Sequence, residues 1–131
     1  MSQYRIGEAA RLLGVSDDTV RRWVASDALP ASKDDSGHLV IDGADLAARA
    51  QSIAVTPDDP SGVESSARNR FVGLVTQILS DPVMSQVELQ CGPYRVVSLM
   101  STEAVRDLRL EVGSLAVAVV KSTMVIVETP A

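Results

Sequence analysis

The chain has 131 residues, enough for one ordinary domain or two small ones, and a net charge of −5. This balance excludes the basic surplus that supports sequence-independent binding to DNA or to an anionic membrane surface. A single cysteine, Cys91, excludes an internal disulfide and suits a reducing cytosol. The first residues form no apolar signal segment, and the longest apolar run, 115–120, is too short to cross a bilayer. We therefore expect a cytoplasmic protein with no membrane partner.

The N-terminal half predicts two short helices joined by a tight turn. Apolar residues recur at the spacing of an amphipathic helix at Ile6, Ala9, Ala10 and Leu13. Gly14 can end that helix in the left-handed conformation, and Ser16 is placed as the N-cap of the next one. On the second helix Trp23 faces inward with the apolar positions, so Arg21 and Arg22 point outward. Two helices with a Gly-containing turn indicate a helix-turn-helix.

The segment from Tyr4 to Ser16, followed by Thr19-Val20-Arg21-Arg22-Trp23, resembles the MerR/excisionase winged-helix family over roughly residues 4–50. The resemblance implies that the second helix lies in the DNA major groove. It also implies a wing with a turn at Gly37-His38, and a third helix that begins at Asp42. The DNA-binding residues that the resemblance implies are Ser16, Thr19, Arg21, Arg22 and His38.

The predicted wing departs from the family pattern. Where the family carries arginines after the glycine, this chain has Leu39 and Val40, and Asp34 and Asp35 come just before. Acidic residues near a phosphate backbone weaken DNA binding, so a helix-turn-helix retained only for protein contacts stays an alternative. In that reading the two arginines are merely solvated and the lone histidine is a turn residue.

A composition break divides the chain. Residues 56–62 are turn formers and poor core material, which predicts an exposed linker. We therefore expect a winged helix-turn-helix domain at 1–54, a linker at 55–65 and a second domain at 66–131. Each domain has a marginal core at this size, so we expect support from oligomerisation.

The second domain predicts a small α+β barrel. Five apolar segments with β-type composition or alternation lie at 71–79, 87–91, 94–100, 115–121 and 124–127. A short helix at 102–110 falls between the third and fourth segments. Three strands, a helix and two more strands match the order of a five-stranded OB-like barrel.

Three short motifs frame these strands: Ser66-Ala67-Arg68-Asn69, Ser101-Thr102-Glu103-Ala104 and Lys121-Ser122-Thr123. Together they resemble the Mop/TOBE domain, the small molybdate-binding barrel of molbindins, molybdate-responsive regulators and some oxyanion transporter ATPases. The resemblance implies molybdate or tungstate as ligand, often bound across a subunit interface, with binding residues Ser66, Arg68, Ser101, Lys121 and Ser122. The family's second hydroxyl, three residues after the first, is Ala104 here, which puts affinity or selectivity in question.

No catalytic constellation accompanies these motifs. The sequence has no Gly-rich phosphate loop, no Ser/His/Asp or Cys/His set and no metal-ligand cluster, so we expect no enzyme and no metal held directly by side chains. The two resemblances together predict a molybdate- or tungstate-responsive regulator that binds an operator in DNA and self-associates through its C-terminal domain. One alternative is a molybdate storage or buffering oligomer with a vestigial DNA-binding domain. Another is a regulator that senses a different small ligand.

Overall fold

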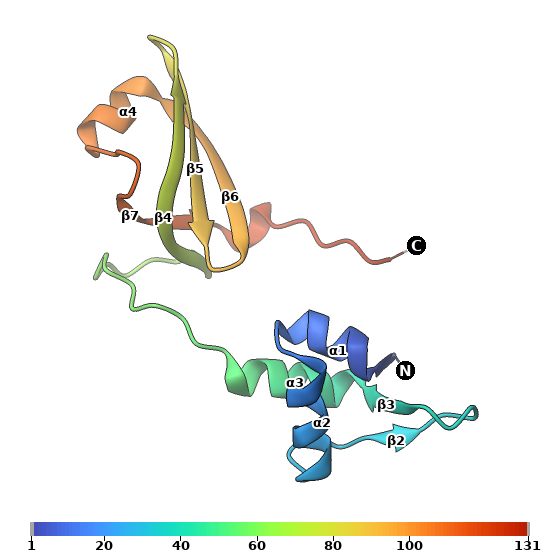
Figure 1. Cartoon of the computed structure of the whole chain (residues 1–131). Coiled ribbons are helices and arrows are strands. Elements are labelled where there is room, and N and C mark those ends of the chain that lie inside the picture. The colour runs from blue at the N-terminus through green and yellow to red at the C-terminus, as the bar shows by residue number, and fades with distance from the viewer. Residues whose placement is uncertain (1, 131) are drawn as a thin grey trace. The chain divides into compact units, whose positions relative to one another are not determined.

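The computed structural model describes residues 2–130, and the chain divides into two compact units, Met1–Val55 and Thr56–Ala131. The first unit contains three helices and a small antiparallel sheet with the order β1-β3-β2 (Figure 1). Its elements are β1 (Gln3–Arg5), α1 (Ile6–Leu13), α2 (Asp17–Ala25), β2 (Ser32–Lys33), β3 (Leu39–Asp42) and α3 (Gly43–Ile53). Strand β1 was not predicted from the sequence; it adds to the edge of β3 through the pair Tyr4 and Ile41.

The predicted helix pair is confirmed together with its boundary signals. Gly14 has φ 68° and its N–H donates to the carbonyls of Ala10 and Arg11, which ends α1. The Ser16 hydroxyl accepts a hydrogen bond from the Thr19 N–H at 3.1 Å and caps α2. Each end thus satisfies backbone groups that the helix itself leaves open.

The third helix begins after Asp42, as expected, but the side chain does not cap it. Its carboxylate accepts from Gln3 Nε2 at 3.1 Å and so fastens β1 to the end of β3.

A single apolar core holds the first unit together. Its buried members are Ile6, Ala9, Ala10, Val20, Leu29, Ile41 and Leu46. Trp23 packs against this core, as predicted, and the guanidinium of Arg49 lies 4.2 Å from the centre of its ring. A cation over an indole face is attractive, so Arg49 ties α3 to α2.

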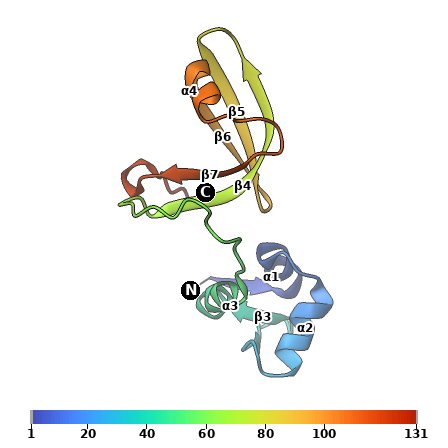
Figure 2. The ribbon, with the colours of Figure 1, turned by 90° about the vertical axis from the view of Figure 1, so that its left-hand side faces the viewer.

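The second unit is one curled antiparallel sheet with the order β6-β5-β4-β7 (Figure 2). Its elements are β4 (Asn69–Ser80), β5 (Met84–Cys91), β6 (Tyr94–Ser101), α4 (Thr102–Asp107), β7 (Leu115–Val120) and a 3-10 helix, η1 (Ser122–Met124). Strand β4 pairs with β7 along its first half and with β5 along its second half, with a bulge between Val75 and Gln77. A long strand shared in this way lets one sheet bend back on itself.

Gly73 permits the closest approach within this sheet. A Cβ added at Gly73 would lie 2.5 Å from the carbonyl oxygen of Gln90 and 2.6 Å from the sulfur of Cys91. Both distances are shorter than van der Waals contact, so only glycine fits between β4 and β5 here.

The short helix α4 is anchored by a chain of hydroxyl groups. Ser85 is 1% exposed, and its Oγ atom lies 2.7 Å from Ser80 Oγ and 2.8 Å from Thr102 Oγ1. The Thr102 hydroxyl donates in turn to the Asp81 carbonyl at 2.7 Å. This chain joins the start of α4 to the β4–β5 hairpin.

Two predictions for the second unit are corrected. The helix expected over 102–110 ends at Asp107, and Arg109 takes a left-handed conformation with φ 54°. A fifth strand over 124–127 is not confirmed, because η1 occupies Ser122–Met124 and residues 125–130 belong to no strand. Ile126 and Val127 are 86% and 83% exposed. A strand needs a sheet edge to pair with, and residues 125–130 pair with no strand of this chain. The structure therefore has a four-stranded curled sheet in place of the expected five-stranded barrel.

Candidate functional site

The strand register gathers four of the five predicted oxyanion residues at one end of the sheet. Asn69 opens β4 and pairs with Val120, which closes β7, and the Asn69 amide donates to the Val120 carbonyl at 3.2 Å. Ser66 and Arg68 lie just before β4, while Lys121 and Ser122 follow β7 directly; all four are exposed. The two cationic side chains and two hydroxyls therefore share one end of a strand pair.

Ser101 lies apart from these four residues. It ends β6 and pairs with Met84 at the start of β5, next to the far end of β4. Its hydroxyl accepts from the Ala104 N–H at 3.0 Å and caps α4, as expected from the sequence. The twelve residues of β4 separate the two locations, so one chain does not bring all five residues together (Figure 1).

Three residues that the sequence did not single out as site residues shape the β4 end. The guanidinium of Arg70 donates to Asp59 from Nε at 2.7 Å and to Ser61 from Nη2 at 2.6 Å. The hydrogen bond from Arg70 holds the pKa of the Asp59 carboxyl well below its usual range. The sequence around Asp59 predicted a turn, but it did not predict that Asp59 would bind Arg70, eleven residues later in the chain.

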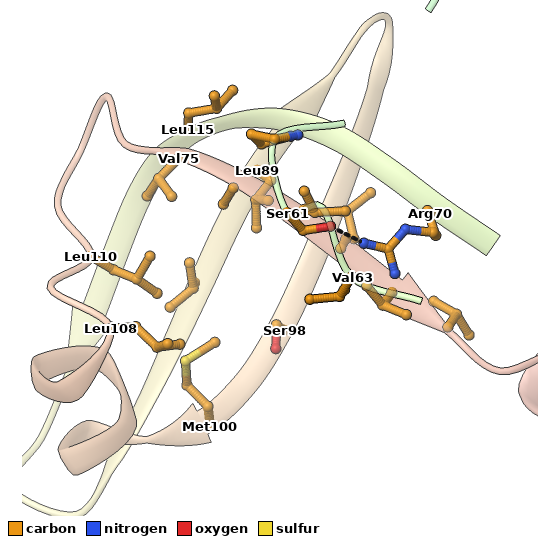
Figure 3. A pocket seen from close by; sticks show the side chains of 18 of the residues that line it. Ser61, Val63, Arg70, Val75, Leu89, Ser98, Met100, Leu108, Leu110 and Leu115 are labelled. Atoms are coloured by element: carbon orange, nitrogen blue, oxygen red, sulfur yellow. Dashed lines mark hydrogen bonds between the residues drawn. The ribbon is translucent and has the colours of Figure 1, made fainter. Parts of the chain in front are cut away.

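The concave side of the curled sheet encloses a cavity of about 890 Å³. Figure 3 shows Val75, Leu89 and Met100 from the strands, with Leu110 from the segment after α4, directed into it. Most of its lining is apolar, and two of its polar side chains, Ser61 and Arg70, are hydrogen-bonded to each other and to Asp59. An apolar wall cannot supply the hydrogen bonds that a dianion loses on leaving water. This cavity is therefore uncovered core surface rather than an oxyanion pocket.

The predicted DNA-contact residues of α2 are linked by hydrogen bonds along the helix surface. The Thr19 hydroxyl lies 2.9 Å from the Ser16 hydroxyl and accepts from Arg22 Nη2 at 3.1 Å. Arg21 Nη1 lies 3.9 Å from the Asp18 carboxylate, and the Arg21 side chain is 60% exposed. Both arginines lie at the surface, as the helix periodicity predicted, and solvent screens so exposed an ion pair.

His38 lies at the turn between β2 and β3. The Asp34 carboxylate accepts backbone N–H groups from Ser36 and His38, each at 2.9 Å. The His38 N–H bond is the main reason that the pKa of Asp34 lies below its usual value. Arg5 Nη2 approaches His38 Nδ1 at 3.3 Å, which brings a cationic side chain from β1 to the hairpin. Asp34 thus serves to fix the turn.

Within residues 2–130, no cluster of three or more His, Cys, Asp or Glu side chains has the arrangement of a metal site. No helix in that range has the length and apolar character needed to cross a membrane.

Comparison with known proteins identifies two domains. Residues 4–53 match the family model of a helix-turn-helix domain, and residues 65–127 match that of the TOBE domain. The molybdenum transport protein ModE of Herbaspirillum seropedicae is 38% identical over 68 residues, which are 51% of this chain and 25% of that protein. The chain matches about a quarter of the length of this curated relative.

Two solved structures resemble the C-terminal unit. A molybdate-binding protein from Sporomusa ovata is 27% identical with a TM-score of 0.49, covering 51% of this chain and 100% of that protein. MopII from Clostridium pasteurianum is 33% identical with a TM-score of 0.47, covering 50% of this chain and 100% of that protein.

Proposed function

We propose that the chain is a cytoplasmic transcriptional regulator that binds DNA through its N-terminal unit and molybdate or tungstate through its C-terminal unit. The observation that carries the proposal is the union, in one chain, of a helix-turn-helix domain with exposed arginines and a TOBE domain. In the second domain the four candidate ligand residues lie next to the paired ends of β4 and β7. The relative named ModE supports molybdate as the ligand class. Binding alone, without catalysis, would perform the function.

The chemistry at the β4 end suits a tetrahedral dianion. Arg68 and Lys121 supply positive charge, and Ser66 and Ser122 supply hydroxyl donors. Hydrogen bonds to a charged partner are roughly twice as strong as neutral ones, so a few such donors are sufficient. Backbone N–H groups of the segments around Arg68 and Lys121 can add to them.

In this proposal the oxyanion site is completed by a second copy of the chain. Ser101 lies at the far end of β4, so it joins the other four residues only from a neighbouring subunit. In the part of the chain that the structure describes, β6 and β7 are edge strands. The concave apolar face is open, and the Ile126–Val127 segment is exposed. We assign to that segment the role of fifth strand on the sheet of a partner, which gives a homo-oligomer through the C-terminal unit.

Pairing of subunits also suits the DNA-binding unit. The whole chain has a net charge of −5, so a single helix-turn-helix unit gains little from sequence-independent attraction, whereas two recognition helices on one operator add their contacts. Arg21 and Arg22 on α2 would contact bases or phosphates, and the β2–β3 hairpin with His38 would act as the wing. Anion binding would alter subunit packing and therefore DNA affinity.

Calorimetric titration with molybdate, tungstate and sulfate tests the ligand. We expect tight binding of the first two and weak binding of sulfate. Lys121→Ala should weaken binding by about 1.5–3 kcal/mol, the typical value of a bond to a charged group. Lys33→Ala, which removes an exposed lysine from β2 in the N-terminal unit, serves as the matched control. Absence of heat with both metal oxyanions would refute the sensor; unchanged affinity in Lys121→Ala would remove that residue from the site.

Fluorescence anisotropy with DNA fragments of the gene's own upstream region tests whether the N-terminal unit binds DNA. We expect salt-sensitive, sequence-specific binding that molybdate alters and that Arg21→Ala/Arg22→Ala weakens. A good bidentate base contact discriminates by roughly 1–3 kcal/mol. Arg11→Ala, an exposed arginine of α1, is the matched control. Binding that survives the double substitution unchanged would place the DNA-reading surface elsewhere.

One observation favours a second candidate, a molybdate storage or buffering oligomer. The β2–β3 hairpin has Leu39 at a position after the glycine where DNA-binding wings of the resembled family carry arginines, and Asp35 comes before that glycine; both residues are exposed. The anisotropy experiment separates the two functions. Oxyanion binding together with no sequence preference for DNA would favour storage.

A further inference from the structure

Part of the expected linker is fastened to the C-terminal sheet. The Asp59 carboxylate accepts from Arg70 Nε at 2.7 Å, from the Ser61 hydroxyl at 2.7 Å and from the Ser61 N–H at 2.9 Å. The Ser61 hydroxyl accepts in turn from Arg70 Nη2 at 2.6 Å. These bonds close a ring of three residues.

The ring is sheltered compared with an ordinary surface ion pair. The side chains of Arg70 and Asp59 are only 22% and 34% exposed. Pro60 and Val63 both line the cavity on the concave side of the sheet. Figure 3 shows Val63 near Ser61. Charged hydrogen bonds therefore hold this short segment against β4.

The ring lies between the candidate oxyanion end of the sheet and the short segment that follows α3. Arg70 is the second residue of β4, two residues after Arg68, so the ring adjoins the candidate oxyanion end of the sheet. On the other side α3 ends at Ile53, which leaves only the five residues 54–58 between α3 and Asp59.

We propose that Asp59, Ser61 and Arg70 form a latch that fastens the linker to the TOBE unit and sets the length of the tether that holds the helix-turn-helix unit. Closed, the latch limits the tether to residues 54–58, a span of at most about 17 Å. Open, it frees residues 54–68, a span of up to about 50 Å. The volume available to the tethered unit scales with the 3/2 power of tether length. Lengthening the tether from residues 54–58 to residues 54–68 therefore lowers the effective concentration of the helix-turn-helix unit about fivefold.

The effect on DNA binding rests on the proposed function. When two helix-turn-helix units of an oligomer bind paired half-sites, the second binding event depends on the effective concentration that the tether sets. A closed latch should therefore favour paired half-sites by about fivefold and leave a single half-site unaffected.

Amide hydrogen exchange in the full-length chain tests the latch without any ligand. In Asp59→Ala and in Arg70→Gln, the Ser61 N–H should exchange at least tenfold faster than in the wild type, while amides of β5 stay protected. Asp58→Ala removes the same charge one residue earlier and is the matched control, since its carboxylate makes no hydrogen bond or ion pair within residues 2–130. Equal Ser61 exchange in all these proteins would overturn the latch.

Two further measurements test the tether. Nitrogen-15 relaxation should show a shorter rotational correlation time for the helix-turn-helix unit in Asp59→Ala than in Asp58→Ala; identical values would overturn control of the tether. On DNA, Asp59→Ala should lose about fivefold in affinity for paired half-sites and nothing for a single one, and equal losses on both would overturn the proposed effect on binding. A wild type that binds no DNA would refute the proposed regulator, whereas exchange and relaxation would still decide the latch.

Discussion

Replacing Gly73 with alanine should destabilise the C-terminal unit by about 1–2 kcal/mol. The new Cβ would lie 2.5 Å from the Gln90 carbonyl oxygen and 2.6 Å from the Cys91 sulfur. The oxygen belongs to the backbone of β5 and the Cys91 side chain is buried, so the strands must separate to relieve the overlap. Overpacking of this kind costs about 1–3 kcal/mol. The reduced freedom of the unfolded chain offsets about 0.4–1 kcal/mol of that cost.

Urea denaturation followed by far-UV circular dichroism, together with amide exchange of β4 and β5, measures this loss. Gly7→Ala is the matched control because its new Cβ would lie 3.8 Å from the nearest side-chain atoms, an ordinary contact, inside helix α1. That variant should stabilise the N-terminal unit by about 0.5–1 kcal/mol, which the fluorescence of Trp23 reports. If Gly73→Ala unfolds at the wild-type urea concentration, the close approach of β4 to β5 does not exist as described.

Two other predictions concern the interior of the same unit. Ser85→Ala removes the centre of the buried hydroxyl chain that links Ser80 to Thr102, so urea denaturation should show a loss of about 1–2 kcal/mol; no loss would mean that the chain is energetically neutral. Burial raises the pKa of the Cys91 thiol, so native protein should resist alkylation at neutral pH. Because the folded pKa exceeds the unfolded value of about 8.5, the thiol's contribution to stability is complete below that pH and is lost as pH rises through the folded pKa. A stability that rises with pH in that window in the wild type, but not in Cys91→Ser, would contradict this sign.

The N-terminal unit could be predicted from sequence largely because its signals are local. The apolar stripe, Gly14 and the Ser16 cap each act over short sequence distances, and α1 ends and α2 begins where these signals predicted. The short strand β1 was missed because it depends on β3, more than thirty residues away. Asp42 shows the same limit, since its position at the start of α3 was predictable but its bond to Gln3 was not.

The residues of the candidate oxyanion site were predicted from the sequence, but their separation into two groups at opposite ends of β4 was not. Apolar composition or alternation indicated four of the strands, yet only the pairing of Asn69 with Val120 shows that Arg68 and Lys121 share an end of the sheet. Ser101 was correctly expected to head a helix, and the register places it at the other end of β4. The Arg70–Asp59 contact escaped prediction because turn-forming residues indicate a loop without indicating what the loop binds.

The apolar segment that follows η1 provides the last prediction. Its composition is that of a strand, yet residues 125–130 form none in the single chain, and burying Ile126 and Val127 would be worth about 1.5–3 kcal/mol each. Their cover must come from another sheet edge, so deletion of residues 125–131 should convert an oligomer, measured by light scattering, into a monomer whose β4 and β5 amides stay protected. Ile126→Lys should have the same effect in full length, whereas Glu128→Lys, an exposed neighbour, should leave assembly intact. If the shortened chain still associates fully, subunits pair through the concave face or the edges of β6 and β7 without this segment, and the shared oxyanion site must be rebuilt on that geometry.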